Sequence, residues 1–346
     1  MRALTISRHG GLEVLEYRDD LPTPAVERAS DVRVRIEAAA LNHLDLFVLG
    51  GLPGVTLVPP WIVAADAVGH VDAVGDAVTS VRVGDRVVLN PGISCRACEY
   101  CAAGEHSLCV RYKLLGEHLP GTAAEHVVVP AANVRAIPAD IPAAEAAAFP
   151  LVTLTAWRML VTRARVRAGE TVLIWGIGGG VALAALQIAK RLGATVWVTS
   201  GSDEKLRRAA ALGADAGFNH RTTDVAKEVR ARTGKRGVDV VVDDVGQATW
   251  AQSLGALGRA GRLVTCGATS GPLVETDVRR LFWNQWSILG STMGNDAEFD
   301  AVVDELRQRR LRPPVDSVFP LAAGRAAFER LSAAEQFGKI VLEVSR

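Results

Sequence analysis

Residues 172–182 read Val172-Leu-Ile-Trp-Gly-Ile-Gly-Gly-Gly-Val-Ala182, an apolar run followed by a glycine turn and the start of an amphipathic segment. Glycines let the backbone approach a pyrophosphate closely, and a following helix offers free N–H groups and the positive end of its dipole. The pattern predicts a dinucleotide pyrophosphate at Gly176, Gly178, Gly179, Gly180 and Val181. Ala182 stands where the strict G-x-G-x-x-G pattern has its last glycine, so a simple strand-to-helix turn is the alternative.

Outward from this turn, residues 171–290 alternate between β-branched runs and amphipathic segments. The runs expected to form strands are Thr171–Trp175, Thr195–Thr199, Ala216–Asn219, Val238–Val242, Arg262–Cys266 and Ser287–Gly290. Several segments between them end in glycine, which is typical of helix C-termini. Strands that alternate with helices in this way predict an α/β fold with a doubly wound parallel sheet made of two mononucleotide-binding halves.

The end of the second predicted strand indicates which dinucleotide binds. An NAD site usually has Asp or Glu here, which bonds to the ribose 2′-OH and would repel a 2′-phosphate. This chain has Ser200 instead, followed by Ser202 and Lys205, which are suited to bind a phosphate. We therefore expect NADP(H), with NAD(H) as the alternative if Lys205 is only a solvated helix residue. Gly267, after the fifth predicted strand, completes the expected cofactor site.

Residues 1–151 have a different pattern, with short runs separated by Gly and Asp turns. Apolar and polar residues alternate from Asp31 to Ile36, as in a half-buried strand. This region is expected to be antiparallel β structure with few helices. The last segment, 295–346, opens with a helical pattern and closes with the strand Lys339–Val344, so we expect it to return to the first domain. The predicted domains are 1–151 completed by 295–346, and 152–294.

A cysteine cluster lies inside the first domain. Cys95, Cys98, Cys101 and Cys109 have the spacing C-x2-C-x2-C-x7-C. Two-residue gaps let successive thiolates turn onto one tetrahedral ion, and four thiolates leave no open position for a substrate. The segment of about 91–112 is therefore predicted to be a lobe that holds one structural Zn²⁺. A disulfide pair and an iron–sulfur cluster are the alternatives.

Composition excludes several classes of partner. The 346 residues include 39 basic and 38 acidic side chains, a net charge of +1, which gives no electrostatic reason to bind nucleic acid or an anionic membrane. The N-terminus has no apolar run of signal-peptide length, and the longest apolar segments are too short to span a bilayer. A cytoplasmic enzyme with a small-molecule substrate is the expectation.

Taken together, these features resemble the medium-chain dehydrogenase/reductase superfamily, which includes zinc alcohol dehydrogenases and quinone oxidoreductases. The likeness covers essentially the whole chain, including Gly84-Asp85-Arg86-Val87 before the cysteine lobe and Gly338-Lys339-Ile340-Val341 near the end. It implies a GroES-like β-rich first domain and a Rossmann second domain, with the active site in the cleft between them.

Departures from the alcohol dehydrogenase pattern occur at the catalytic zinc ligands. The first ligand, a Cys, corresponds to Asn42 in Asn42-His43-Leu44-Asp45, and the Gly-His-Glu motif corresponds to Ala64-Ala65-Asp66. The third ligand position aligns with about Leu151. Asn42, Asp45 and Asp66 instead resemble the zinc-free quinone oxidoreductase branch, although that branch usually lacks the four-cysteine lobe kept here.

The resemblance implies an active site at Asn42, His43, Asp45 and Thr155. Asn42 is a candidate donor to an enolate oxygen, His43 a proton relay or a contact for the cofactor phosphates, and Thr155 a residue near the nicotinamide. The predicted function is NADPH-dependent reduction of an activated double bond of a conjugated carbonyl or quinone, without catalytic zinc. The alternatives are an alcohol dehydrogenase or carbonyl reductase, and a cofactor-binding protein with little turnover.

Assembly follows from the same family likeness. Members commonly dimerise by joining the last strands of two Rossmann sheets, and Trp286–Met293 is a strand-like segment at that place. An unpaired apolar edge would be a liability for a monomer. We expect a homodimer, which can pair further into a tetramer.

Overall fold

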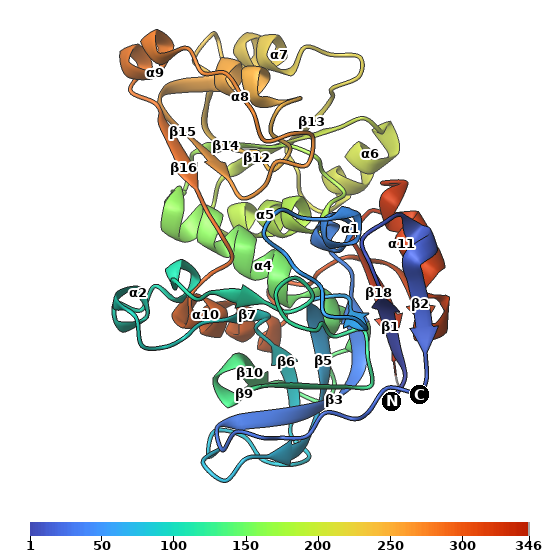
Figure 1. The fold of residues 1–346 in the computed structure, drawn as a ribbon. Helices are drawn as coiled ribbons and strands as arrows, with labels where there is room; N and C mark the ends of the chain where they lie inside the picture. Colours follow the sequence, from blue (N-terminus) through green and yellow to red (C-terminus); the bar gives the residue numbers. More distant parts are fainter. Residues whose placement is uncertain (345–346) are drawn as a thin grey trace. The chain divides into compact units, whose positions relative to one another are not determined.

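The fold is that of a computed structural model, which describes residues 1–344 (Figure 1). These residues divide into two compact units. The first unit comprises Met1–Leu151 and the segment from Asn295 onward, and the second comprises Val152–Gly294.

The second unit is built on one parallel sheet with the strand order β13-β12-β11-β14-β15-β16 (Figure 1). All neighbouring strands in it run parallel. This order is that of a doubly wound dinucleotide-binding sheet, so the predicted fold class is confirmed. The bounds are β11 (Thr171–Ile174), β12 (Thr195–Ser200), β13 (Ala216–Asn219), β14 (Val238–Val242), β15 (Leu257–Thr265) and β16 (Ser287–Gly290).

Strand β15 begins earlier than the sequence pattern suggests. The sequence pattern placed this strand at Arg262–Cys266. In the structure Leu257 already pairs with Val238 of β14, and the register shifts before Arg262 pairs with Val240. Pairing with the neighbouring strand therefore extends β15 toward the N-terminus, beyond the predicted apolar run.

Helices of the second unit follow the strands in alternation: α5 (Gly180–Arg191), α6 (Asp203–Ala211), α7 (Val225–Arg232), α8 (Trp250–Ala256) and α9 (Val278–Asn284). In α5 the buried face includes Ala185 and Ile188, and Gly193 ends the helix with a φ of +79°. The core of this unit contains Leu173 and Val241, each 0% exposed. Strands buried on both faces explain the continuous apolar runs in the sequence.

The first unit contains a mixed seven-stranded sheet with the order β10-β6-β5-β3-β18-β17, and β9 also pairs with β3. Its strands are β3 (Asp31–Ala40), β5 (Asp66–Val74), β6 (Arg86–Leu89), β9 (His126–Pro130), β10 (Val134–Ala136), β17 (Val315–Pro320) and β18 (Lys339–Glu343). Val32, Val34 and Ile36 of β3 are each 0% exposed, as their alternation predicted.

One pairing in this sheet departs from the expected antiparallel structure. β18 pairs antiparallel with β3 but parallel with β17. Parallel neighbours need a crossover connection, and α11 (Gly324–Ser332) lies between β17 and β18 in the chain. β18 is therefore an interior strand of the sheet, between β3 and the edge strand β17.

Smaller elements complete the first unit. β1 (Ala3–Ile6), β2 (Leu15–Arg18) and β4 (Trp61–Ile62) form a separate sheet, and the pair β7 (Gly92–Ile93) and β8 (Lys113–Leu114) flanks the cysteine lobe. The helices of the first unit are η1 (Leu12–Val14), α1 (His43–Gly50), α2 (Glu99–Ala102), η2 (His106–Leu108), η3 (Ala131–Asn133), α3 (Ala143–Ala148), α10 (Asp296–Arg307) and η5 (Leu321–Ala323). α4 (Pro150–Trp157) begins at the end of the first unit and lies mostly in the second, which also contains the π-helical η4 (Arg158–Arg163).

Candidate active site

The four clustered cysteines converge on one point. Cys98 precedes α2, Cys101 lies within it, and Cys109 follows η2. Their Sγ atoms and that of Cys95 all lie within 4.8 Å of one another. Cys101 Sγ is 3.6 Å from Cys98 Sγ and 4.0 Å from Cys95 Sγ. A tetrahedral zinc ion with bonds of about 2.3 Å holds its sulfurs about 3.8 Å apart, so this donor set fits zinc.

Local hydrogen bonds from backbone N–H groups stabilise the thiolate forms of these cysteines, which are the forms that bind a cation. The N–H groups of Cys95 and Arg111 donate to Cys109 Sγ at 3.2 and 3.3 Å. The backbone N–H of Ala97 is the largest influence that lowers the pKa of Cys95 to about 5. Burial raises the pKa of Cys101 to about 11, and a cation at the centre of the cluster would oppose that shift. The separations are far too long for a disulfide, and all the cysteines are free.

The coordination set defines a structural site. Four thiolates fill a tetrahedral shell and leave no position for a substrate. Among residues 1–344, these cysteines are the only group of three or more His, Cys, Asp or Glu ligands close enough to share an ion. The predicted zinc lobe is thus compatible with one structural Zn²⁺.

The glycine turn between β11 and α5 has the geometry that a pyrophosphate site needs. Gly176 and Gly178 have φ values of +69° and +121°, which side-chain-bearing residues rarely adopt. The N–H of Gly176 donates to Thr199 Oγ1 at 3.2 Å, which ties the turn to β12. Gly179 is the N-cap of α5, so Gly180 and Val181 begin the helix with N–H groups directed toward the turn.

The end of β12 brings the two predicted serines together. Ser202 donates its N–H to Ser200 Oγ at 3.2 Å, and its own side chain caps α6 by accepting from the N–H of Lys205 at 3.4 Å. Ser200 is buried, whereas Ser202 and Lys205 are partly exposed. Gly267 follows β15, at the same C-terminal edge of the sheet as β12.

One residue at this edge escaped the sequence analysis. Arg221 follows β13, which pairs with β12, and a β-carbon at Gly201 would lie only 2.7 Å from Arg221 Nε. The guanidinium therefore lies beside the turn that follows Ser200, and Arg221 is exposed. Strand order is the signal that could have found it, because β13 is the neighbour of β12 in doubly wound sheets.

Another such residue is Asp244, the second residue after β14. Burial, with a contribution from the neighbouring Asp243, raises the pKa of Asp244 to about 6. Asp243 is the structural member of the pair, because it accepts hydrogen bonds from Thr249 and Ser253 and from two backbone N–H groups. The sequence offers no pattern that separates the two carboxylates.

In the first unit, Asn42 and Asp66 belong to one buried network. Asn42 caps α1, and Asp66 begins β5. Asn42 Nδ2 donates to Asp66 Oδ2 at 2.9 Å, and the N–H of Leu151 donates to Asp66 Oδ1 at 2.8 Å. Lys339, which begins β18, places its Nζ 3.0 Å from Asp66 Oδ2. The structure thus brings together Asn42, Asp66 and Leu151, which the sequence analysis aligned with the family's metal-binding motifs.

Asp45 is engaged entirely with backbone groups. Its Oδ2 accepts from the N–H of Asn42 at 2.7 Å and its Oδ1 from the N–H of Ala64 at 3.2 Å. Burial outweighs these two hydrogen bonds and raises the pKa of Asp45 to about 7. The carboxyl group joins the start of α1 to the chain before β5.

The other two predicted site residues lie in different units. His43 is exposed and packs edge-on against Phe47, with ring centroids 4.8 Å apart. Desolvation by the surrounding protein lowers the pKa of His43, so the ring is neutral near pH 7. Thr155 belongs to α4 in the second unit, where its Oγ1 contacts Met293 Sδ at 3.6 Å.

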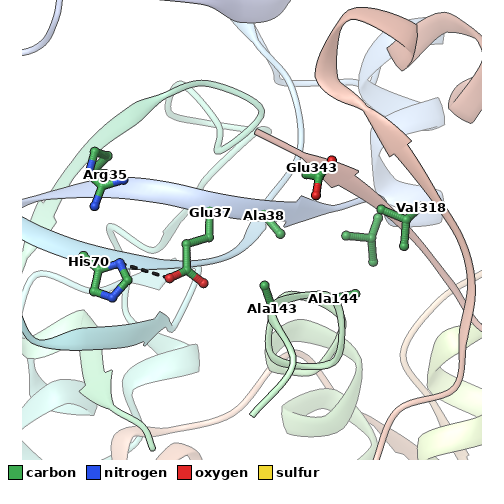
Figure 2. Close-up of a pocket in the computed structure, with 9 residues that line it drawn as sticks. Arg35, Glu37, Ala38, His70, Ala143, Ala144, Val318 and Glu343 are labelled. Atoms are coloured by element: carbon green, nitrogen blue, oxygen red, sulfur yellow. Dashed lines mark ion pairs between the residues drawn. The ribbon is translucent and has the colours of Figure 1, made fainter. Parts of the chain in front are cut away.

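A pocket of about 340 Å³ in the first unit contains none of the predicted residues. Figure 2 shows Glu37 and His70 side by side at one end, where His70 Nδ1 lies 3.0 Å from Glu37 Oε1. Arg86 also pairs with Glu37, at 2.8 Å. The Arg86 guanidinium pairs with the Glu37 carboxylate and so links β6 to β3.

Comparisons with known proteins agree with this architecture. The alcohol dehydrogenase GroES-like domain family matches residues 28–139, and the zinc-binding dehydrogenase family matches residues 180–308. The quinone oxidoreductase of Pseudomonas aeruginosa is 32% identical over 99% of this chain and 99% of its own length.

Solved structures are similar over their whole length. A crystal structure described as an NAD-dependent alcohol dehydrogenase is 46% identical, with a TM-score of 0.95 and coverage of 100% of both chains. The cobalt- and zinc-bound thermostable alcohol dehydrogenase from Pyrobaculum aerophilum is 34% identical, with a TM-score of 0.88 and coverage of 99% of both chains.

A GroES-like unit, a dinucleotide-binding unit and these relatives together define an oxidoreductase that acts on small molecules. The chain belongs to the medium-chain dehydrogenase/reductase superfamily, alongside quinone oxidoreductases and zinc-type alcohol dehydrogenases. Within residues 1–344, every helix is too short or too polar to cross a membrane.

Proposed function

We propose that this protein is an NADPH-dependent reductase of an activated carbon–carbon double bond in a conjugated carbonyl or quinone, and that it transfers hydride without a catalytic zinc. The main support is the charge-paired network of Asn42, Asp66 and Lys339. This network offers an amide, one carboxylate and an ammonium group, without the thiolates and imidazoles that hold zinc in oxidoreductases.

To reduce an enone, the protein mainly has to position the cofactor and the substrate and to stabilise the negative charge that forms on the substrate oxygen. NADPH, when bound, supplies a hydride to the β-carbon of the substrate. The electron pair of the double bond then forms a new double bond between the α-carbon and the carbonyl carbon, and the carbonyl π pair moves onto oxygen, where an N–H of Asn42 stabilises the negative charge. A proton taken up from water at the α-carbon, or at oxygen in a quinone, completes the reduction.

His43 and Thr155 have supporting roles in the proposal. A neutral imidazole can move a proton in either direction between water and a substrate, and the lowered pKa of His43 keeps the ring neutral. Contact with the cofactor phosphates is the alternative role for His43. Thr155 is proposed to contact the nicotinamide through its hydroxyl group. Asp45 is proposed to position Asn42, because its oxygens accept from backbone N–H groups.

NADPH rather than NADH is proposed from the end of β12. Ser200 provides no negative charge to repel a 2′-phosphate, and Arg221 beside Gly201 adds a cation that can bind one. Ser202 and Lys205 lie on the same turn. NADH is the competing cofactor, because one similar solved structure is described as NAD-dependent.

A second candidate function is alcohol dehydrogenation or carbonyl reduction. The specific support is the 46% identity to a structure described as an alcohol dehydrogenase, together with the retained cysteine lobe. We propose that the lobe binds one zinc ion per chain whichever of the two functions is correct, because its four thiolates fill the tetrahedral shell of a structural ion.

We also propose a cytoplasmic homodimer that can pair into a tetramer. β16 is an edge strand of the second-unit sheet. Trp283 and Phe282 on α9 are 68% and 64% exposed, which leaves apolar area available for a second copy.

The deciding experiment is a panel of enones, quinones, enoyl thioesters and simple alcohols, scored by NADPH consumption or NADP⁺ reduction. The proposal expects NADPH consumption with at least one conjugated substrate and negligible alcohol oxidation. Alcohol-dependent NADP⁺ reduction, with a second metal ion per chain, would favour the alcohol dehydrogenase instead. Tight NADPH binding without turnover on any substrate would leave only a cofactor-binding protein.

A further inference from the structure

Lys339 belongs to a motif that the sequence analysis quoted but gave no function. Its side chain is 4% exposed, and its Nζ donates to Asn42 Oδ1 as well as lying 3.0 Å from Asp66 Oδ2. Gly338 makes this placement possible: its φ is +119°, and a β-carbon there would meet the carbonyl oxygen of Pro314 at 2.3 Å. The N–H of Lys339 donates to the same oxygen at 2.9 Å, so the start of β18 is held firmly.

The charges around Asn42 allow only one orientation of its amide. An ammonium group can only donate, so the atom of Asn42 that faces Lys339 must be oxygen. A carboxylate can only accept, so the atom that faces Asp66 must be the NH₂ group. A flipped amide would place NH₂ against ammonium and oxygen against carboxylate, and both contacts would be repulsive.

This orientation leaves a donor available. Nδ2 has two N–H groups, one of which is bonded to Asp66, and no other residue among 1–344 accepts from the second. The ammonium group on Oδ1 also withdraws electron density from the amide, which strengthens Nδ2 as a donor, since linked hydrogen bonds polarise one another. Lys339 thus makes Asn42 a single, polarised N–H donor.

We propose that Lys339 is a positioning residue for Asn42: it fixes and polarises the amide so that an N–H is presented to the developing negative charge on the substrate oxygen. This inference rests on the proposed function, in which Asn42 is that donor. It assigns the buried cation an effect on turnover through Asn42, separate from any contribution to the stability of the first unit.

The test compares the turnover of NADPH with an active conjugated substrate in a set of variants. Lys339→Met alone leaves Asp66 as an unpaired buried charge and can prevent folding, so the pair Lys339→Met/Asp66→Asn removes both charges together. Lys339→Arg keeps the charge and the donors. We expect the pair to lower kcat about tenfold to a hundredfold, with little change in NADPH affinity, and Lys339→Arg to retain most of kcat.

A double-mutant cycle separates positioning from general stability. If Lys339 acts through Asn42, the charge-removing pair should change kcat little once Asn42→Ala is present. Multiplicative losses in kcat would overturn the positioning role. If Asn42→Ala has normal kcat, the proposed donor itself is wrong. If Asn42→Ala is slow and the charge-removing pair is not, only the role of Lys339 is wrong.

A measurement without substrate covers the case in which no conjugated compound is turned over. The side-chain ¹⁵NH₂ signal that disappears in Asn42→Ala identifies this amide in NMR spectra of the full chain. We expect this signal to shift and exchange faster with solvent in Lys339→Met/Asp66→Asn, and to stay close to the wild-type position in Lys339→Arg. An unchanged signal in the charge-removing pair would show that Lys339 does not control the amide.

Discussion

Among single residues, Asp45 combines a buried carboxyl group with two backbone N–H donors. Its pKa of about 7 means that the folded protein keeps a proton that the unfolded chain releases near pH 4. The free energy of unfolding should therefore fall as the pH rises from about 4 to 7, by at most about 1.4 kcal/mol per pH unit from this group. Above that window both states are ionised, and the dependence ends.

The variant Asp45→Asn should remove this part of the pH dependence. Thermal unfolding midpoints at half-unit steps between pH 4.5 and 7.5 measure this effect: the midpoint of the wild type relative to that of Asp45→Asn should be highest at pH 4.5 and should fall as the pH rises to about 7. Asp19→Asn, at an exposed carboxylate, is the matched control. Parallel profiles for wild type and Asp45→Asn would show that Asp45 is already ionised at acidic pH.

Cofactor choice is a second question at the residue level. Ser200→Asp should reverse the order of affinities by placing a carboxylate against the 2′-phosphate, and Arg221→Gln should weaken NADPH about tenfold while leaving NADH nearly unchanged. Fluorescence titration of both cofactors measures each dissociation constant. Lys227→Gln, at an exposed cation on α7, is the control. A wild-type protein that binds NADH more tightly would contradict the interpretation of the β12 end.

The sequence could identify some of these residues and not others. Asn42 and Ser200 replace the residues that known sequence patterns have at these positions, and Asp45 keeps the expected residue. A comparison with those patterns therefore points directly to all three. Arg221 lacks such a signal, and the motif around Lys339 assigns no role to its side chain, because both roles depend on neighbouring strands. Arg221 lies beside Gly201 through the β13–β12 pairing, and Lys339 reaches Asn42 across 297 residues of sequence.

At the level of elements, we expect the cysteine lobe to depend on a bound ion for its stability. Its helices α2 and η2 are only four and three residues long, too short to be stable without external constraint. Cys98→Ser should bind substoichiometric zinc and lower the thermal unfolding midpoint, because the binding energy of the ion is also folding energy. Elemental analysis and calorimetry measure the two effects.

The control for that variant is Cys266→Ser, which changes a cysteine outside the cluster. It should keep one zinc per chain. Equal zinc content in Cys98→Ser and Cys266→Ser would refute the four-thiolate site.

The edge strand β16 allows a prediction about assembly. Ile288 lies on this strand and is partly exposed, so Ile288→Lys should place a charge at the proposed junction of two sheets and yield monomers. Val318→Lys, on the edge strand β17 of the first unit, is the matched control and should stay dimeric. Light scattering at micromolar concentration decides the matter, and a wild-type mass of 36.7 kDa would exclude the dimer.

Elements of the second unit were more predictable than those of the first. In residues 171–290 most strands are short apolar runs, and the helices α5, α6 and α7 are each followed by a glycine with a positive φ, so these signals are local. The parallel pairing of β17 with β18 had no comparable signal, because it depends on the crossover through α11 and on β3 as the other neighbour of β18. Local patterns therefore predicted the Rossmann strands, and tertiary pairing decided the C-terminal ones.

For the whole molecule, the combination of a structural metal lobe with an amide–carboxylate–ammonium network is the central feature. The lobe retains four thiolates, whereas the network at Asn42 has a fixed cation where the family pattern has metal ligands. An enzyme built in this way should need zinc for stability and not for hydride transfer. Its short-term turnover should then be independent of any accessible metal ion.

The rate of NADPH oxidation by the best conjugated substrate, measured before and after a brief treatment with a chelator, tests this account most directly. The rate should stay unchanged, because an ion enclosed by four thiolates exchanges slowly and takes no part in the reaction. A rate that is lost within the treatment and restored by added zinc would contradict the account and identify the protein as a zinc-dependent dehydrogenase.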